Sequence, residues 1–331
     1  MKVNETINIL CATDDNYAPY CGIMLTSLFE SNRNRSIEVW VLMDGDITNR
    51  NRLKFEKLQQ KYSNEIHLVE VDDERLKDLL NRLNNGETQI YHTYVTTPSY
   101  YRLLAADLLP ETVHKIIYMD CDIAVDGDIT PLWNVDLSDK AIACVRDCYV
   151  LDKETDKRLG YPKGKGYFNA GVVVFNLDYW RKERMTERIF EYVRGRANQL
   201  KYLDQDILNG VLWDEKLFVP ERFNFQVVYF APYFWQDYPD DFRRDLLEEC
   251  RKAVVIHYCC ILKVWDFRYY GGPFYSVWEK YRKMSLWSNA HITKPLKTYV
   301  WFMMKRWLFP KKLKKQRQGN WVVLTENETC F

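Results

Sequence analysis

The sequence lacks any long uncharged apolar stretch. No segment of about 18 residues is both apolar and uncharged, and the chain runs through Asn4 and Glu5 straight into a strand-like segment. Accordingly, we expect neither a transmembrane helix nor a secretory signal. We therefore expect a protein that acts inside the cell.

Glycine and proline are scarce, with 13 and 11 among 331 residues. Hydrophobic residues make up 47% and charged residues 28%, which excludes disordered and collagen-like chains. The nine cysteines are odd in number and scattered, and without Cys-x-x-Cys pairs they suggest neither a disulfide framework nor structural zinc. We expect reduced thiols, and a length that fits one large α/β domain with a short appendage.

The usual glycine-rich phosphate-binding motifs are also missing. The turn after the first expected strand reads Ala-Thr-Asp-Asp-Asn-Tyr over residues 12–17, without G-x-G-x-x-G or a Walker lysine. This excludes the common dinucleotide and P-loop sites. Asp14 and Asn16 could bind a base or a ribose, or they could form an Asx-type cap on a helix beginning near Pro19. Both interpretations stay open from the turn alone.

Short runs rich in Val, Ile and aromatic residues predict buried strands. They cover residues 6–12, 37–42, 66–71, 115–119, 141–145 and 171–176. Helix-period segments at 19–31, with Pro19 at its start, and at 48–62, after a Thr48 cap, separate the first three runs. The alternation predicts a doubly wound α/β fold with a Rossmann-like, mostly parallel sheet flanked by helices. Its ligands should collect where the strands end.

The composition changes after about residue 285, and we divide the chain there into a domain at 1–285 and a C-terminal segment at 286–331. Residues 294–317 hold nine Lys or Arg, no Asp or Glu, and many interleaved aromatic residues. We favour a helical segment that attaches to an anionic membrane surface. The alternatives are a helix that packs its aromatic side chains on the domain, and nucleic-acid binding, which the net acidic remainder of the chain disfavours.

Asp120, Cys121 and Asp122 follow the expected strand at 115–119. The sequence holds four Asp-x-Asp triplets, against about two expected by chance, so their position matters more than their presence. His257 ends the apolar run 253–256 in the same way, although a single histidine after a strand is more often structural. Carboxylates and an imidazole at one sheet edge suit Mn²⁺ or Mg²⁺ clamping a diphosphate, and Lys263 could neutralise phosphate charge.

Two further polar clusters lie beside apolar segments. Tyr-Phe-Asn-Ala-Gly at 167–171 precedes a Val-rich run, and Asp-Gln-Asp at 204–206 opens the segment 207–210. Carboxylates and amides suit sugar hydroxyls, because each hydroxyl both donates and accepts a hydrogen bond. Asp204 alone could equally be a helix cap.

Taken together, these motifs resemble glycosyltransferase family 8, which includes bacterial lipopolysaccharide galactosyl- and glucosyltransferases and, more distantly, glycogenin. The resemblance spans residues 6 to about 309. It is carried by ATDDNYAPY (12–20), YYRL (100–103), MDCDIAV (119–125), YFNAGVVVFN (167–176), YLDQDILNG (202–210), RFNF (222–225) and HYCCILKVW (257–265). It implies a GT-A type fold, a UDP-sugar donor, Mn²⁺ or Mg²⁺, and retention of the donor's anomeric configuration.

Carried over position by position, the resemblance implies roles for individual residues. A metal would be bound by Asp120, Asp122 and His257. The nucleotide-sugar site would comprise these three residues with Ala12, Thr13, Asp14, Asn16, Arg102, Cys121, Asn169, Ala170, Asp204, Gln205, Cys260 and Lys263. The catalytic candidates would be Gln205, Asp206 and Asp204. Cys260 and Val264 stand where the family usually has glycine and proline, so the loop that carries Lys263 departs from the pattern.

We therefore predict a retaining, metal-dependent hexosyltransferase. It would move galactose or glucose from a UDP-sugar to a hydroxyl of a glycan or glycolipid, in bacterial lipopolysaccharide or other cell-surface glycan biosynthesis. We place it in the cytoplasm, peripherally on the inner membrane face, and expect no nucleic-acid partner. Front-side attack is favoured over double displacement through Asp206. The alternatives are a non-catalytic UDP-sugar or glycan-binding protein of the same fold, and a metal-dependent nucleotidyltransferase or hydrolase, which leaves the two polar clusters unexplained.

Overall fold

A seven-stranded sheet forms the centre of the molecule. The computed structural model describes residues 5–43, 45, 47–84, 97–148, 154–259, 262–269, 271–290 and 304. The strands lie in the order β3-β2-β1-β4-β7-β6-β8. Their bounds are Ile7–Thr13 (β1), Ile37–Met43 (β2), Glu65–Glu70 (β3), Lys115–Met119 (β4), Ile142–Arg146 (β6), Phe168–Asn176 (β7) and Lys216–Phe218 (β8).

The sheet is mostly parallel, as predicted. Four neighbouring pairs run parallel, and β7 is antiparallel to both of its neighbours, β4 and β6. The six expected strands all exist, although β7 begins at Phe168, three residues before the expected start. The earlier start matters because it places Asn169 and Ala170 inside the strand, where the backbone fixes their positions.

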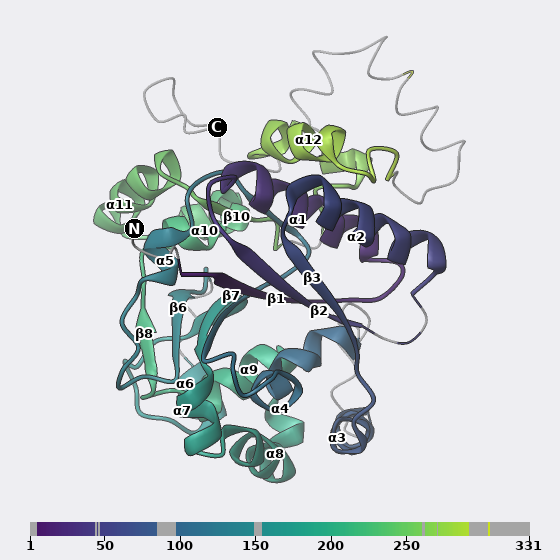
Figure 1. The fold of residues 1–331 in the computed structure, drawn as a ribbon. Coiled ribbons are helices and arrows are strands. Elements are labelled where there is room, and N and C mark those ends of the chain that lie inside the picture. The colour runs from purple at the N-terminus through teal and green to yellow at the C-terminus, as the bar shows by residue number, and fades with distance from the viewer. Residues whose placement is uncertain are drawn as a thin grey trace.

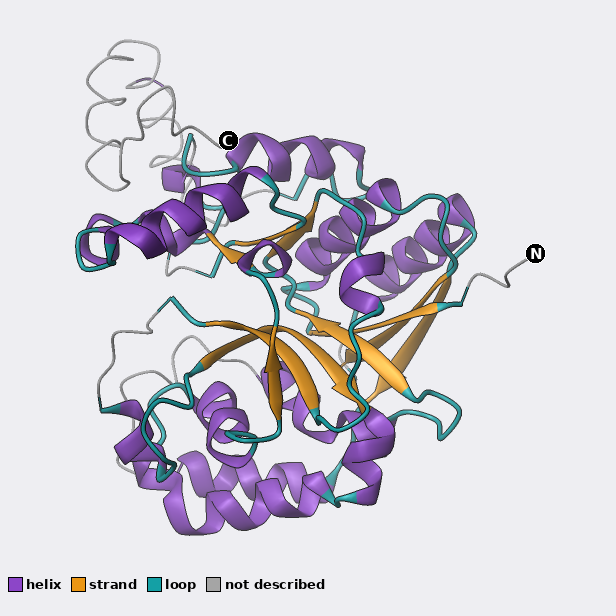
Figure 2. Cartoon of the chain, turned by 90° about the vertical axis from the view of Figure 1, so that its left-hand side faces the viewer, coloured by secondary structure: helices purple, strands orange, loops and turns teal. Residues whose placement is uncertain are grey.

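Helices cover both faces of the sheet and give the fold three layers (Figures 1 and 2). One layer contains α1 (Ala18–Ser31), α2 (Asn49–Tyr62), α10 (Pro232–Trp235), α11 (Asp240–Arg251) and α12 (Tyr275–Met284). The other contains α3 (Glu74–Asn84), α4 (Ala105–Leu108), α6 (Thr155–Leu159), α7 (Leu177–Lys182), α8 (Met185–Arg196) and α9 (Leu203–Val211). The short α5 (Thr130–Trp133) follows β5.

The alternation of side chains along β1 explains the layers. Ile9 and Cys11 belong to the core cluster on one face, whereas Leu10 and Ala12 belong to the cluster on the other. A strand buried on both faces carries apolar residues on both sides, which is why the sequence of β1 from Ile9 to Ala12 is uninterrupted by polar residues. The expected Thr48 cap is also present, since its side chain accepts a hydrogen bond from the backbone N–H of Asn51.

A second, three-stranded sheet was not expected from the sequence. It consists of β5 (Ile123–Val125), β10 (Val255–His257) and β9 (Phe225–Gln226), in that order. β10 is antiparallel to β5, and His257 pairs with Ile123. The backbone N–H of Tyr258 also donates to the carbonyl of Asp122 at 2.9 Å. This pairing brings residues more than 130 positions apart in the chain to the same edge.

Trp287, in the described residues 285–290 that follow α12, packs against the helical layer that holds α1 and α2. Trp287 is 2% exposed, its ring lies against Gly22, and its indole Nε1 donates to Asn51 at 2.9 Å. The basic segment 294–317 lies outside the described residues apart from Met304, so the division at residue 285 stays a prediction. Among the helices described, none combines the length and apolarity that crossing a bilayer requires.

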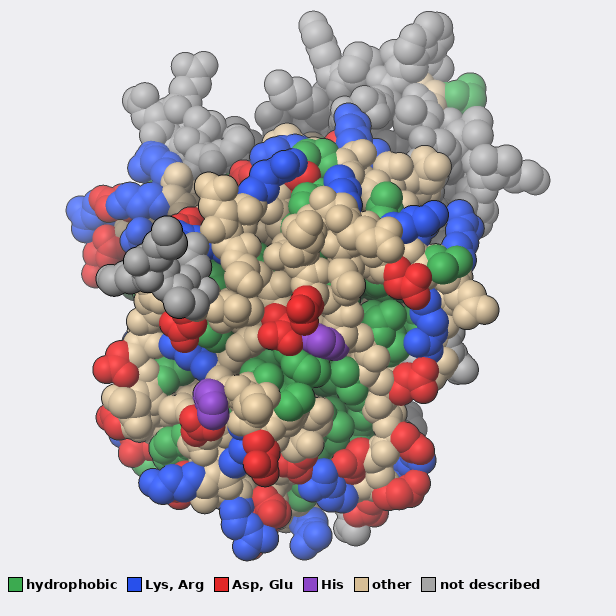
Figure 3. All heavy atoms as spheres, in the orientation of Figure 1, with side chains coloured by type: hydrophobic (Ala, Val, Ile, Leu, Met, Phe, Trp, Pro, Cys, Tyr) green, Lys and Arg blue, Asp and Glu red, His purple; other side chains and the backbone are tan. Residues whose placement is uncertain are grey.

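The described surface mixes charges of both signs. Acidic and basic side chains are interspersed over the face seen in Figure 3, without one large basic patch. Six described cysteines are free thiols, which agrees with the expectation of reduced sulfur. Cys250 takes part in a disulfide, so that expectation is wrong at this residue.

Candidate active site

A polar cleft of about 290 Å³ lies where β4, β7 and β10 meet. Most of its lining side chains are charged or carry an amide. They are Ser99, Arg102, Asp120, Asp122, Asp147, Asn169, Ala170, Gly171, Lys201, Tyr202, Asp204, Gln205, His257, Cys259 and Lys263. The cleft thus gathers nine of the residues predicted for the nucleotide-sugar site.

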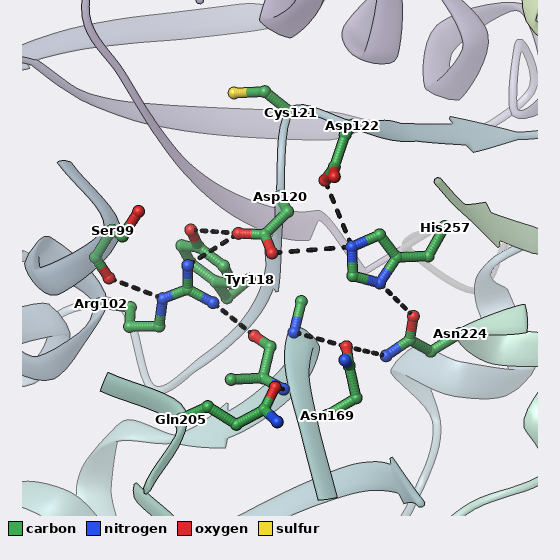
Figure 4. Close-up of polar contacts among 12 residues, drawn as sticks. Ser99, Arg102, Tyr118, Asp120, Cys121, Asp122, Asn169, Gln205, Asn224 and His257 are labelled. Carbon is green, nitrogen blue, oxygen red and sulfur yellow. Dashed lines mark hydrogen bonds and ion pairs between the residues drawn. The ribbon is translucent and has the colours of Figure 1, made fainter. Parts of the chain in front are cut away.

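The three predicted metal ligands converge in this cleft (Figure 4). One ligand atom from each of Asp120, Asp122 and His257 lies within 4.8 Å of the other two. His257 Nε2 is 3.2 Å from Asp122 Oδ1 and 3.8 Å from Asp120 Oδ2. Two carboxylate oxygens and one imidazole nitrogen are a donor set that suits Mn²⁺ and also accommodates Mg²⁺. The residues present therefore fit a divalent cation.

Asp120 is held by two donors on the side away from His257. Arg102 Nη2 and the Tyr118 hydroxyl both donate to its Oδ1 at 2.8 Å (Figure 4). The Arg102 guanidinium is itself fixed by the carbonyls of Ser99 and Ala170, and it lies over the Tyr118 ring. Because these donors occupy Oδ1, Oδ2 is the oxygen left facing the metal position.

Asp122 carries its charge despite being buried. Burial works to raise the pKa of its carboxyl, but Lys263 and His257 outweigh that effect and hold the pKa well below the usual range. Lys263 Nζ lies 2.5 Å from Asp122 Oδ2. The ammonium thus stands beside the predicted metal ligand, and its contact with a diphosphate stays a prediction.

Asp204 and Gln205 face the cleft from the first turn of α9. The N-cap of this helix is Tyr202, so Asp204 lies inside the helix and is not its cap. Burial raises the pKa of Asp204 to about 6, with Arg102 at 3.2 Å opposing the shift. Gln205 is oriented by Ala170, whose N–H donates to its Oε1 at 3.0 Å.

Asp206 faces the other way, into the body of the protein. Its side chain is fully buried and pairs with Arg158 at 2.5 Å. It also accepts from the Tyr167 hydroxyl and from the backbone N–H groups of Lys201 and Tyr202. It does not line the cleft. The structure therefore brings Asp204 and Gln205 together with the metal ligands, but not Asp206.

The predicted base- and ribose-binding turn adjoins the cleft without lining it. Cys121 Sγ donates to the Ala12 carbonyl at 3.2 Å, which joins the end of β1 to the metal-site turn. Asp14 Oδ1 accepts from the Tyr17 N–H at 2.8 Å and so holds the turn before α1, but the N-cap of α1 is Tyr17 and not Asp14. Thr13 is buried and donates to the Asp14 carbonyl, whereas Asn16 is exposed. Their binding of a nucleotide stays a prediction.

Cys260, which replaces the family glycine, lies outside the described residues. Val264, which replaces the proline, is buried in the core beside this loop. Their flanking residues Cys259 and Lys263 both line the cleft. The departure from the family motif therefore leaves the lysine directed into the site.

Sequence reasoning missed six lining residues, Ser99, Asp147, Gly171, Lys201, Tyr202 and Cys259, and the supporting residues Tyr118 and Asn224. Asp147 directly follows β6, so the rule that polar residues after strands face the ligand edge would have identified it. A Cβ atom on Gly171 would lie 2.2 Å from the His257 ring and 2.9 Å from Asp120 Oδ2. No local pattern signals that requirement, because it arises from a strand pairing distant in sequence.

Comparisons with known proteins agree with this geometry. The family model described as Glycosyl transferase family 8 matches residues 8–268. General stress protein A of Bacillus subtilis is 28% identical over 272 residues, which cover 80% of this chain and 90% of that protein. The lipopolysaccharide 1,2-glucosyltransferase of Escherichia coli is 28% identical over 267 residues, which cover 80% of this chain and 74% of the relative.

Solved structures show the same fold. A crystal structure of galactosyltransferase LgtC with donor and acceptor sugar analogs matches with a TM-score of 0.71 and 26% identity. The match covers 88% of this chain and 98% of LgtC, and it confirms the predicted GT-A type architecture. Sequence, fold and cleft agree, and the chain belongs to glycosyltransferase family 8.

Proposed function

We propose that this glycosyltransferase moves a hexose, galactose or glucose, from a UDP-hexose to a hydroxyl of a glycan or glycolipid, with a divalent metal and with retention at the anomeric carbon. The observation that carries the proposal is the convergence of Asp120, Asp122, His257 and Lys263 opposite Asp204 and Gln205 in one cleft. Charge-binding groups thus face hydroxyl-binding groups across a cleft of about 290 Å³.

A cation bound by Asp120, Asp122 and His257, Mn²⁺ or Mg²⁺, would act as a Lewis acid toward the diphosphate oxygens. Lys263 supplies a second positive charge beside Asp122. Bond cleavage between the hexose C1 and the β-phosphate oxygen leaves that oxygen with new negative charge. A preorganised ammonium close by stabilises this charge without having to reorganise.

The residues across the cleft would hold the hexose and the acceptor. Asp204 accepts hydrogen bonds from hydroxyl groups, and the Gln205 amide can both donate and accept. We favour front-side attack, in which the acceptor oxygen bonds to C1 as the UDP oxygen leaves and takes the hydroxyl proton. Support comes from the position of Asp206, whose carboxylate is buried against Arg158 on the far side of α9. A hexosyl adduct trapped on Asp206 would contradict this mechanism.

The acceptor class rests on the relatives. The Escherichia coli and Salmonella typhimurium relatives bear the names lipopolysaccharide 1,2-glucosyltransferase and lipopolysaccharide 1,3-galactosyltransferase. We propose a lipopolysaccharide or another cell-surface glycan as the acceptor. The test is incubation of each UDP-hexose with Mn²⁺ and a panel of lipopolysaccharide core oligosaccharides, followed by NMR of the product. An α-linked product from an α-linked donor supports the proposal, whereas a β-linked product overturns retention.

We also propose that the protein acts in the cytoplasm, peripherally on the inner membrane face, through the basic aromatic segment. The sequence from 294 to 317 supports this, because nine cations interleaved with aromatic residues suit an anionic headgroup layer. The test compares the full chain with a full-length variant in which Lys311, Lys312, Lys314 and Lys315 are replaced by Gln. Equal partitioning of both into phosphatidylglycerol vesicles at low salt would contradict the attachment.

A further inference from the structure

We infer that Asn224 is a positioning residue that fixes the tautomer of His257 and so presents Nε2, with its lone pair, to the metal position. The inference rests on the proposed metal-dependent function but concerns a residue outside the cleft lining. Asn224 lies between the short 3₁₀ turn Glu221–Phe223 and β9, and its side chain is fully buried. Its contacts form a chain whose donors and acceptors can be assigned in order (Figure 4).

The chain is anchored at Asn169. The backbone N–H of Gly171 donates to Asn169 Oδ1 at 3.0 Å, and a peptide nitrogen can only donate. On the other side, Asn169 Nδ2 donates to Asp147 Oδ2 at 3.0 Å, and an ionised carboxylate can only accept. Both contacts fix the same orientation of the Asn169 amide. The usual ambiguity between amide oxygen and nitrogen is therefore removed.

The orientation of Asn224 follows from that of Asn169. Asn224 Nδ2 lies 2.9 Å from Asn169 Oδ1 and must donate to it. Asn224 Oδ1 then faces His257 Nδ1 at 2.9 Å, and an amide oxygen can only accept. His257 Nδ1 must therefore carry the hydrogen. In the neutral ring the lone pair is then on Nε2, which points at Asp120 and Asp122.

Because the contact between Asn224 and His257 is buried, its loss would leave the His257 Nδ1–H without a partner. His257 is 3% exposed, and the contacts of Asn224 are all buried, so water cannot easily substitute for the lost partner. Groups that hydrogen-bond the second nitrogen of a metal-binding histidine set its orientation and typically change metal affinity about 10- to 100-fold. Asn224 has the position and the chemistry for this role.

The same chain reaches the candidate catalytic amide. Asp147 Oδ2, which accepts from Asn169, also accepts from Gln205 Nε2 at 3.1 Å. One continuous set of hydrogen bonds thus runs from His257 through Asn224, Asn169 and Asp147 to Gln205. These hydrogen bonds fix the position of His257, beside the predicted metal position, relative to Gln205 on the other side of the cleft.

The first experiment measures the tautomer directly in the metal-free full-length protein. Long-range ¹H–¹⁵N spectra of ¹⁵N-histidine-labelled protein, recorded at alkaline pH on the neutral ring, distinguish the two tautomers. The His257 signals are identified by their absence in His257→Gln. We expect Nδ1 to carry the hydrogen. A ring with the hydrogen on Nε2 overturns the inference, whether or not the protein binds a metal.

The second experiment measures Mn²⁺ affinity by electron paramagnetic resonance for the wild type, Asn224→Leu and Asn32→Leu. Asn32 is a matched control, since it is 4% exposed and its side chain donates to the carbonyls of Leu28 and Gly127, none of which lines the cleft. We expect Asn224→Leu to weaken Mn²⁺ binding about 10-fold or more, and Asn32→Leu to leave it unchanged at a similar loss of Tm.

The outcomes separate this inference from the proposed function. Equal Mn²⁺ affinity in folded Asn224→Leu and wild type overturns the positioning role while leaving the metal site intact. Absence of Mn²⁺ binding in the wild type contradicts the proposed metal dependence. In that case the tautomer measurement, which needs neither the variant nor the metal, still decides whether Asn224 orients His257.

Discussion

The guanidinium of Arg102 lies between Asp120 and Asp204, 2.8 Å from Oδ1 of the first and 3.2 Å from Oδ2 of the second. It therefore joins the candidate metal site to the candidate sugar site. Its side chain is 4% exposed, so the two ion pairs are shielded from solvent. Loss of the guanidinium would disturb both halves of the cleft together.

Replacement of Arg102 by Lys should lower kcat/KM for the UDP-hexose by about 100-fold, because one ammonium cannot reproduce the forked geometry. Arg181→Lys is the matched control, since Arg181 donates to the backbone carbonyls of Ala106 and Val113 away from the cleft. Steady-state kinetics and Tm should be measured for both variants. Equal activity of Arg102→Lys and wild type would contradict the assigned role.

Gly171→Ala should reduce Mn²⁺ binding and activity by at least about 10-fold, since the new methyl group would overlap His257 and approach Asp120. The control is Gly195→Ala within α8, where the added methyl group meets nothing within 4 Å. Titration with Mn²⁺ checks both. Unchanged Mn²⁺ affinity in folded Gly171→Ala would contradict this expectation, because it would mean that His257 can move away from the methyl group without weakening the metal site.

Asp206→Asn should lower the free energy of unfolding by about 3 kcal/mol, because it leaves the Arg158 charge poorly compensated in a buried pair. Gln205→Ala should instead reduce kcat with little change in stability. Urea unfolding and kinetics of the two variants test this division. A large loss of kcat in Asp206→Asn at unchanged stability would favour double displacement through Asp206.

The pKa of Asp204 makes a prediction about stability and pH. Its pKa is about 6 in the folded protein against an ordinary 3.8, so the folded state binds the extra proton between these values. Folding is therefore favoured at low pH, and this contribution is lost as the pH rises through about 6. Between pH 4 and pH 7 the free energy of unfolding of wild type should fall by up to about 3 kcal/mol more than that of Asp204→Asn.

Urea unfolding of wild type and Asp204→Asn at several pH values in this range measures whether this stability difference falls as the pH rises. Most other titrating groups contribute equally to both proteins and cancel in the difference. A difference between the two proteins that does not vary with pH would show that Asp204 titrates normally. If wild type instead gained stability relative to Asp204→Asn as the pH rises, the pKa of Asp204 would be lowered in the folded protein.

The sequence predicted six of the seven strands of the main sheet, because most of these six are buried and read as apolar runs, whereas the three-residue β8 was missed. β1 and β4 were found to within one residue, and Thr48 was correctly identified as a cap. The short β5, β9 and β10 were not assembled into a sheet, because strands of two or three residues carry no periodicity.

The same distinction applies to the candidate site: residues next to apolar runs could be predicted, and residues placed by contacts distant in sequence could not. Asp120, Asp122 and His257 each follow an apolar run, so position alone suggested them. Gln205 and Asp206 are adjacent in sequence, and only the helix α9 shows that one faces the cleft and the other the core. Asn224 and Gly171 act through packing between distant segments, which spacing along the chain does not encode.

Metal-dependent hexose transfer is tested by UDP release from UDP-Gal, UDP-Glc, UDP-GalNAc and UDP-GlcNAc, with and without Mn²⁺, for wild type, Asp122→Asn and Asp128→Asn. Asp128 belongs to another Asp-x-Asp triplet, caps Thr130 and lies at the surface. We expect Mn²⁺-dependent release from one hexose donor by wild type and Asp128→Asn, and none by Asp122→Asn. Release that is indifferent to Mn²⁺ and to Asp122→Asn would contradict it, and failure to bind any UDP-sugar would contradict the proposed donor class.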